Sequence, residues 1–261
     1  MRWDLFLYQG LTLYLLIWGR TAGFFMTAIP FSGNTIPVQI KVWLAALLAF
    51  LVFMVTYQEP IVVSTNLFGY VLQFGGEVLI GCMLGFITQI TFAVFQLAGQ
   101  VIDMQIGFGI VNVIDPQSGI QVPLLGNFQY LLALLCFFVI NGHHVLLSGL
   151  VRSYQLLPIG GGAYINNNVC AFIFDLAGAM FADAFKLALP VLGALFIADL
   201  VVGIIARAVP QVNVFIVSMP LKIGLGLGLM MIVIPALVWA FEMQFNALFQ
   251  HYSDLLLILR R

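Results

Sequence analysis

The chain has 261 residues, of which 63% are hydrophobic and only 7% are charged, with a formal net charge of −1. A soluble domain carries about 25% charged residues, so no soluble fold of this size could bury so much apolar surface. The small net charge also excludes the basic patch on which nucleic-acid binding depends, and the composition indicates a polytopic membrane protein.

Two membrane-spanning helices are predicted at the start of the chain. The first covers residues 5–29 and carries Gly19-x-x-x-Gly23, a spacing that lets two helices approach closely, with Arg20 inside the motif. The second covers residues 42–57. Both are apolar along most of their length and are separated by a turn rich in proline and glycine.

The third predicted helix is unusually long. No proline occurs between Pro60 and Pro116, so the helix can extend from Leu67 to Ile106. These roughly forty residues would measure about 60 Å, twice the thickness of the hydrocarbon core. We therefore expect this helix to kink or to project beyond the bilayer. It also carries a second motif for close helix packing, Gly81-x-x-x-Gly85.

Polar side chains recur along one face of this third helix, namely Gln89, Gln96, Gln100 and Asp103. Steps of 7, 4 and 3 residues keep them within one sector of an α-helix. Two interpretations stay open: a hydrogen-bonded seam between helices, or a wall that faces water in an assembly. Both place this face against protein rather than lipid.

The segment that follows, residues 99–123, is too rich in glycine, proline and polar residues to span a bilayer, and too apolar for a solvated loop. Irregular backbone at membrane depth persists only where it is buried in protein or lines a water-filled cavity. We predict that this segment obstructs a pore; the alternative is a packed connector.

The composition of the predicted plug explains how it would work. Glycines give backbone freedom on the helix side, apolar side chains exclude water and ions by dewetting, and an Asp-Pro turn reverses the chain. The plug residues are Gly107, Phe108, Gly109, Ile110, Val111, Val113, Ile114, Asp115, Pro116 and Pro123.

Three further apolar segments follow, at residues 128–150, 171–206 and 223–241. The second exceeds one bilayer crossing, and we expect it to kink at Pro190. Residues 207–222 are expected to form a linker. The fold class predicted is an all-α integral membrane protein of about six hydrophobic segments that form long kinked helical hairpins, with a mid-chain pore loop.

Five charged residues lie inside the apolar segments and are expected to be buried: Arg20, Glu77, Asp183, Lys186 and Asp199. Each would cost about 2.5–3.5 kcal/mol at a helix centre if it faced lipid. Asp183 and Lys186 are three residues apart and can pair on one helix face, and Arg20 can pair with Glu77 across helices. The alternative is an ion or proton relay, as in a secondary transporter or ion channel.

No pattern in the sequence indicates catalysis or a bound metal. The cysteines Cys82, Cys136 and Cys170 form no CxxC motif, and adjacent histidines such as His143 and His144 point about 100° apart on a helix. We therefore predict no enzymatic activity, no cofactor and no metal site.

Several blocks, taken in order, resemble one family. They are GRTAGFF at 19–25, GQVIDMQIGFGIVNVIDPQSG at 99–119, NGHH at 141–144, LLPIGG at 156–161 and RAVPQVNVFIVSMPLKIGLGL at 207–227. The sequence resembles the FliR/SctT family, which comprises the R subunits of the flagellar protein-export gate and the T subunits of type III secretion injectisomes. PQVNVF and PLKIG favour the flagellar branch; the injectisome T subunit is the alternative.

The resemblance implies a single membrane domain, residues 1–261, made of N-terminal helices (1–98), a pore-plug region (99–123) and C-terminal helices (124–261). It implies a channel subunit of the flagellar type III export gate in the bacterial inner membrane, at the flagellar basal body. Implied partners are the P and Q gate subunits, the substrate-switch B subunit and the A subunit, with unfolded flagellar proteins as substrates. In the family, the loop that matches residues 107–123 plugs the closed pore.

Overall fold

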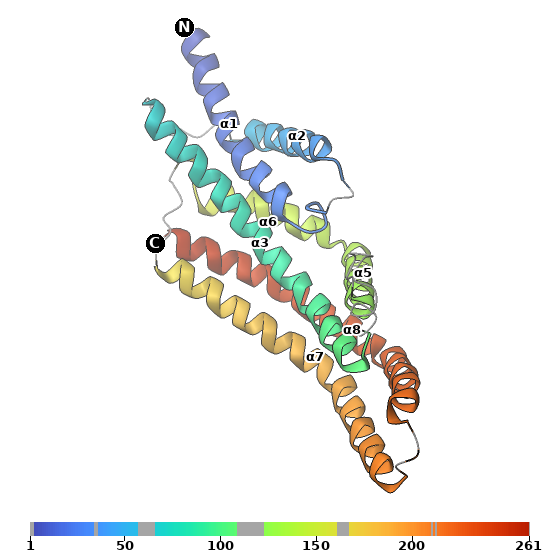
Figure 1. Cartoon of the computed structure of the whole chain (residues 1–261). Coiled ribbons are helices and arrows are strands. Elements are labelled where there is room, and N and C mark those ends of the chain that lie inside the picture. Colours follow the sequence, from blue (N-terminus) through green and yellow to red (C-terminus); the bar gives the residue numbers. More distant parts are fainter. Residues whose placement is uncertain are drawn as a thin grey trace. The chain divides into compact units, whose positions relative to one another are not determined.

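The structure is a computed structural model that describes residues 3–33, 36–56, 66–108, 123–160, 167–209, 211 and 213–260. Within these residues the chain forms seven α-helices and no strand (Figure 1): α1 (Trp3–Thr27), α2 (Val38–Thr56), α3 (Leu67–Ile106), α5 (Leu124–Val139), α6 (Gly142–Leu156), α7 (Asn167–Ala208) and α8 (Val214–Arg260). The all-α class predicted from the sequence is confirmed.

Four of these helices, α2, α3, α7 and α8, are long and apolar enough to cross a membrane. A fifth crossing results if α5 and α6 are counted as one broken span. The helix α1, predicted as the first span, is not among the four. The six spans expected from the sequence are therefore not confirmed.

The long third helix forms as predicted. The helix α3 runs without interruption for 40 residues, from Leu67 to Ile106. At about 1.5 Å per residue it measures about 60 Å. The glycines within it are tolerated because several of them pack directly against other helices, as described below.

The segment at residues 128–150 is not one helix, which corrects the sequence interpretation. The helix α5 ends at Val139, and α6 starts at Gly142 after Asn141, whose φ of 57° is left-handed. Asparagine adopts this conformation more readily than most residues, and an Asn-Gly pair is a turn signal. The same NGHH block that carries the family resemblance therefore breaks the helix.

The linker expected at residues 207–222 is also shorter than predicted. The helix α8 begins at Val214 and continues through Pro220 and Pro235 to Arg260, and α7 continues through Pro190. Proline within an apolar helix is tolerated when neighbouring helices or side chains satisfy the freed backbone groups. The helix α8 therefore includes part of the expected linker, and Pro190 lies inside one continuous helix, as the predicted segment 171–206 requires.

The chain divides into two compact units. Unit 1 comprises Met1–Ile90, Asn141–Asp175 and Phe245–Arg261, and unit 2 comprises Thr91–Ile140 and Leu176–Gln244. The helices α3, α7 and α8 each contribute residues to both units, whereas α1, α2 and α6 belong to unit 1 and α5 to unit 2.

The core of unit 1 is built around α1, which packs against the first half of α3. A Cβ atom added at Gly81 on α3 would collide with the Arg20 carbonyl, and one at Gly23 on α1 would collide with the Val78 carbonyl. The two glycine motifs therefore meet face to face and bring the backbones of α1 and α3 into contact. Close backbone approach of this kind leaves Leu16 and other side chains of α1 fully buried.

The core of unit 2 is an aromatic cluster contributed by α3, α5 and α8. The ring of Phe92 lies 5.6 Å from that of Phe137 and 6.0 Å from that of Phe241, and Phe95 lies 4.8 Å from Phe241. By contrast, only 17% of the most apolar stretch of α7 or α8 is buried, against 61% for α3. The α7–α8 hairpin therefore leaves most of its apolar surface uncovered by its own chain.

Candidate functional site: the base of the central loop

The predicted plug leaves α3 at a left-handed glycine. Gly107 has a φ of 99°, and the amides of Gly107 and Phe108 both donate to the Asp103 carbonyl at 3.1 Å. A glycine in this conformation directly after the last helical residue is a common helix C-terminus, because the missing Cβ removes the steric penalty. Gly107 therefore ends α3 and turns the chain away from the helix axis.

The carboxylate of Asp103 binds the other end of the loop. It accepts hydrogen bonds from the Leu125 amide at 2.9 and 3.0 Å and from the Gly126 amide at 3.1 Å, in the first turn of α5. Pro123, which precedes α5, supplies no side-chain cap. Asp103 of α3 therefore caps the N-terminus of α5. The helix dipole of α5 also favours a negative charge at this position.

A glycine pair brings α3 and α5 together beside this cap. A Cβ added at Gly99 would lie 2.5 Å from the Gly126 Cα, and one at Gly126 would lie 3.0 Å from the Gln96 carbonyl. The two backbones are thus in direct contact eight residues before the loop begins at Gly107. Together with the Asp103 cap, this contact fixes both ends of the loop at one place in unit 2.

Only the ends of the predicted plug lie within the described residues. Gly107, Phe108 and Pro123 are half-buried. The remaining plug residues, Gly109, Ile110, Val111, Val113, Ile114, Asp115 and Pro116, lie outside the described ranges.

The four polar residues on α3 differ in their surroundings. Gln89 donates to the Thr27 carbonyl of α1 at 2.8 Å, and Asp103 bonds to α5 as described. Gln96 is exposed and Gln100 is half-buried. Two of the four therefore bond to other helices, whereas Gln96 faces outward from the chain.

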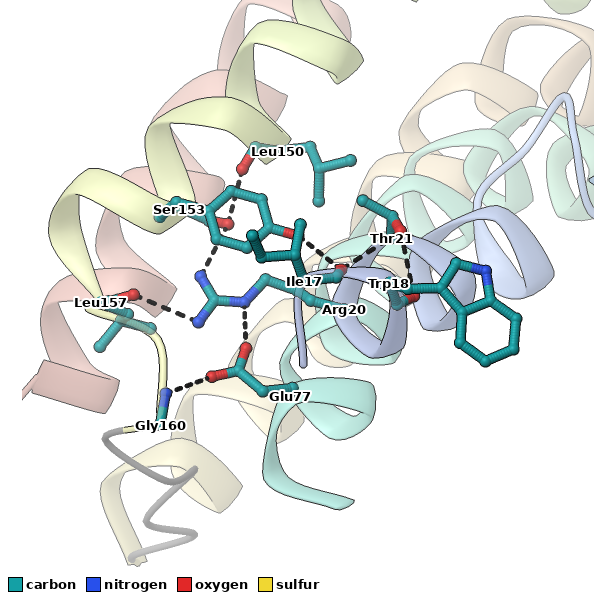
Figure 2. Close-up of polar contacts among 10 residues, drawn as sticks. Ile17, Trp18, Arg20, Thr21, Glu77, Leu150, Ser153, Leu157 and Gly160 are labelled. Atoms are coloured by element: carbon teal, nitrogen blue, oxygen red, sulfur yellow. Dashed lines mark hydrogen bonds and ion pairs between the residues drawn. The ribbon is translucent and has the colours of Figure 1, made fainter. Parts of the chain in front are cut away.

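A second polar centre lies in unit 1, around the buried guanidinium of Arg20 (Figure 2). Its Nε donates to Glu77 Oε2 at 2.6 Å, Nη1 to the Ser153 hydroxyl at 3.1 Å, and Nη2 to the Leu157 carbonyl at 3.2 Å. The group also stacks over the Tyr154 ring, 4.4 Å from its centroid. Each of the three guanidinium nitrogens thus donates a hydrogen bond, and the charge has a counter-ion, which are the conditions for burying it.

Glu77 completes this centre by binding the turn after α6. Its second oxygen accepts from the Gly160 amide at 2.9 Å, and Gln73 donates to the Gly160 carbonyl at 3.2 Å. Both side chains come from α3. The ion pair therefore joins α1 and α3 to the end of α6 and to the turn that follows it.

The other three charges expected to be buried are not. The Asp183–Lys186 pair forms at 2.8 Å, but its side chains are 32% and 71% exposed, and Asp199 is 35% exposed in its pair with Lys222. The physical reason is that α7 has few neighbours in the isolated chain. Of the five charges, the structure buries Arg20 and Glu77, at 0% and 1% exposure.

Sequence reasoning missed the partners of several of these charged groups. They are the Leu125 and Gly126 amides for Asp103, the residues Ser153, Tyr154 and Gly160 for the Arg20–Glu77 pair, and Lys222 for Asp199. Of these, Gly160 sits in the LLPIGG block and Lys222 in the PLKIG block, so the family motifs were the available signal. Among the described residues, no three His, Cys, Asp or Glu side chains gather as a metal site.

Comparison with known proteins identifies the family. A sequence model described as "Bacterial export proteins, family 1" matches residues 11–248, which is most of the chain. This chain belongs to that family. The Flagellar biosynthetic protein FliR of Bacillus subtilis (strain 168) is 39% identical over 213 residues, covering 81% of this chain and 82% of the relative.

A second relative extends the match along the chain. The Flagellar biosynthetic protein FliR of Escherichia coli (strain K12) is 31% identical over 239 residues, covering 91% of this chain and 90% of the relative. The protein of Aquifex aeolicus (strain VF5) with the same name is 29% identical over 242 residues. Membership of the bacterial export family thus rests on nearly the whole length of the chain, and the matched residues 11–248 include both polar centres.

Proposed function

We propose that this chain is a channel-forming core subunit of the flagellar type III export gate, closed at rest by the loop at residues 107–123. The observation that carries the proposal is the anchored loop base. The Asp103 carboxylate and the Gly99–Gly126 contact hold both ends of an apolar loop at one point. A loop fixed at its base can obstruct a pore without spanning the membrane itself.

The closing mechanism follows from the sequence of the loop. Its five apolar side chains, Phe108, Ile110, Val111, Val113 and Ile114, offer no hydrogen bonds to water. A constriction lined by such side chains excludes ions because wetting it is unfavourable. Passage of an unfolded flagellar protein would displace the loop about Gly107, whose φ of 99° marks the point of departure from α3.

The exposed apolar surface supports membership of an assembly. Most of α7 and α8 is uncovered by the chain itself, so sister subunits or lipid must cover it. The proposed partners are the P and Q subunits, the B and A subunits of the export apparatus, and membrane lipid. The proposed location is the bacterial inner membrane at the flagellar basal body, with residues 1–261 as one membrane domain and no catalytic step in this chain.

The transporter alternative has less support. A relay requires ionisable groups that can exchange protons or ions, whereas Arg20 and Glu77 bond to each other and to three further polar groups, and the Arg20 guanidinium lies over the Tyr154 ring. Such fully bonded pairs are typical of structural contacts. The flagellar names of the relatives also favour the flagellar gate over the injectisome T subunit.

Deletion of residues 108–114 in cells tests the plug. Because the deletion removes the apolar constriction but leaves Gly107, Asp103 and α5, we expect severalfold faster ion leakage while the gate still assembles. The measurement is ion flux across the cytoplasmic membrane, with recovery of the intact gate complex as the control for assembly. An assembled gate that stays ion-tight would contradict the plug.

A point substitution tests the anchor separately. Asp103→Ala removes the cap from α5 and should give a smaller leak than the deletion, because the apolar residues remain. Asp183→Ala is the matched control, since it removes a carboxylate from α7 that bonds to Lys186 and Gln244 but not to the loop base. Equal leakage from the two variants would contradict an anchoring role for Asp103.

A further inference from the structure

The last turn of α3 is also bound to the α7–α8 hairpin of unit 2. Gln105 of α3 donates from Nε2 to Asp199 Oδ2 of α7 at 3.0 Å. Lys222 of α8 lies 2.5 Å from the other oxygen, Oδ1 of Asp199. One carboxylate therefore joins three helices, with a separate oxygen for each partner.

An apolar contact lies beside this carboxylate. A Cβ added at Gly226 of α8 would collide with the side chain of Ile106, the last residue of α3. Ile106 is itself buried. The two final residues of α3 before Gly107 thus contact the hairpin, one through a hydrogen bond and one through packing.

A groove lies along the hairpin at this level. It has a volume of about 320 Å³ and is lined by aliphatic side chains from residues 194–205 of α7 and 217–225 of α8. Asp199 and Lys222 lie within these two stretches. Because dispersion contacts are lost across such a gap, the ion pair is a direct tie between α7 and α8 along this part of the hairpin.

We propose that Asp199 is a positioning residue, which couples the α7–α8 hairpin to the last turn of α3 and so fixes the direction in which the chain leaves α3 at Gly107. If Asp199 only neutralised a charge in an apolar hairpin, Lys222 would be its one required partner. The bond from Gln105 to the second oxygen of Asp199 favours a positioning role over simple charge neutralisation. The consequence for ion leakage rests on the plug proposed above, whereas the positioning does not.

The same helix provides a matched control. Asp183 also lies on α7 and also bonds to one lysine and one glutamine, Lys186 at 2.8 Å and Gln244 at 2.8 Å. Those partners are on α7 and α8, and none is on α3. The Asp183→Asn and Asp199→Asn variants therefore remove the same charge and one acceptor oxygen from the same helix. Only in the second do a lysine and the α3 glutamine have to compete for the one oxygen that remains, so only the second weakens the bond to α3.

The test measures the mobility of the last turn of α3 in the assembled gate. A spin label is attached at Met104→Cys, a position that is 72% exposed in the isolated chain, in a chain whose Cys82, Cys136 and Cys170 are replaced by alanine. We expect D199N to raise label mobility severalfold and D183N to leave it unchanged. Equal mobility in D199N and D183N would overturn the inference.

A second variant separates positioning from simple charge pairing. Gln105→Met keeps the volume of the side chain and leaves the Asp199–Lys222 pair intact, yet removes the bond to α3. We expect it to reproduce the D199N increase in label mobility, and an immobile label in Q105M would overturn the coupling. Because Q105M removes no charge, assembly of the gate is expected to be normal.

Ion leakage through the gate in these variants tests whether the position of the last turn of α3 affects the plug. If residues 107–123 close the pore, D199N and Q105M should leak more than D183N and less than the deletion of residues 108–114. A deletion that does not leak would contradict the plug, and the label would still decide the role of Asp199. A leaking deletion combined with an unchanged label in D199N would contradict the role of Asp199 alone.

Discussion

The ion pairs of unit 1 and unit 2 differ in how far the chain itself encloses them. In unit 1, Arg20 and Glu77 are enclosed completely and bond to groups from α1, α3, α6 and the turn that follows α6. In unit 2, Asp183 and Asp199 are paired but partly exposed on an apolar hairpin. The comparison indicates that unit 1 satisfies its ion pair internally, whereas unit 2 presents charged and apolar surface to surroundings beyond this chain.

The largest effect should follow from breaking the pair in unit 1. Glu77→Ala leaves the Arg20 guanidinium buried without its counter-ion and removes the acceptor of the Gly160 amide. Loss of one partner of a buried pair typically costs about 3–5 kcal/mol. We expect a strongly reduced yield of the protein in membranes and a lower Tm in detergent.

The double variant R20M/E77M provides the control for this prediction. Replacing both members of a buried pair with apolar side chains of similar volume is often neutral, so the double variant should be more stable than E77A. If it were as unstable as E77A, the hydrogen bonds from Arg20 to Ser153 and Leu157 would matter more than the ion pair itself.

A smaller effect should follow from adding bulk at glycines of the two units. Gly81→Val forces a side chain into the Arg20 backbone of α1, whereas Gly203→Val on α7 meets nothing within 4 Å. Overpacking typically costs about 1–3 kcal/mol, and a surface change typically stays within about 0.5 kcal/mol. Thermal unfolding of the isolated chain in detergent should therefore separate the two variants.

Recovery of the assembled gate provides a further test of the two glycine variants. If another subunit covers α7, Gly203→Val should reduce recovery of the gate complex while leaving the isolated chain unaffected. An effect of G203V on the isolated chain as large as that of G81V would contradict the description of α7 as uncovered.

Local sequence signals predicted the elements but not their tertiary partners. The absence of proline from residues 61–115 correctly indicated the uninterrupted α3, and the two glycine motifs correctly indicated close helix packing. The prediction of one helix over residues 128–150 was wrong, because the Asn141-Gly142 turn interrupts an otherwise apolar segment. The prediction of a linker up to residue 222 was also wrong, because α8 continues through Pro220.

The polar centres were only partly accessible to sequence reasoning. Arg20 and Glu77 were paired because two opposite charges in apolar helices require partners. Leu157 and Gly160 contribute through their backbone groups, which no side-chain pattern reports. The exposure of Lys186 depends on how many helices surround α7, a property of the fold and its assembly rather than of the α7 sequence.

The smallest effect on the isolated chain should come from Lys186→Gln. The Lys186 side chain is exposed, and an exposed ion pair contributes about 0–1 kcal/mol, so the Tm of the isolated chain should hardly change. In the gate the result depends on what covers α7: a charge that faces lipid is costly and its removal should favour assembly, whereas a charge that bonds to a sister subunit should be required for it. Recovery of the gate complex from K186Q cells measures this difference directly. A large loss of Tm in the isolated chain would instead place Lys186 with Arg20, among the charges that the chain satisfies by itself.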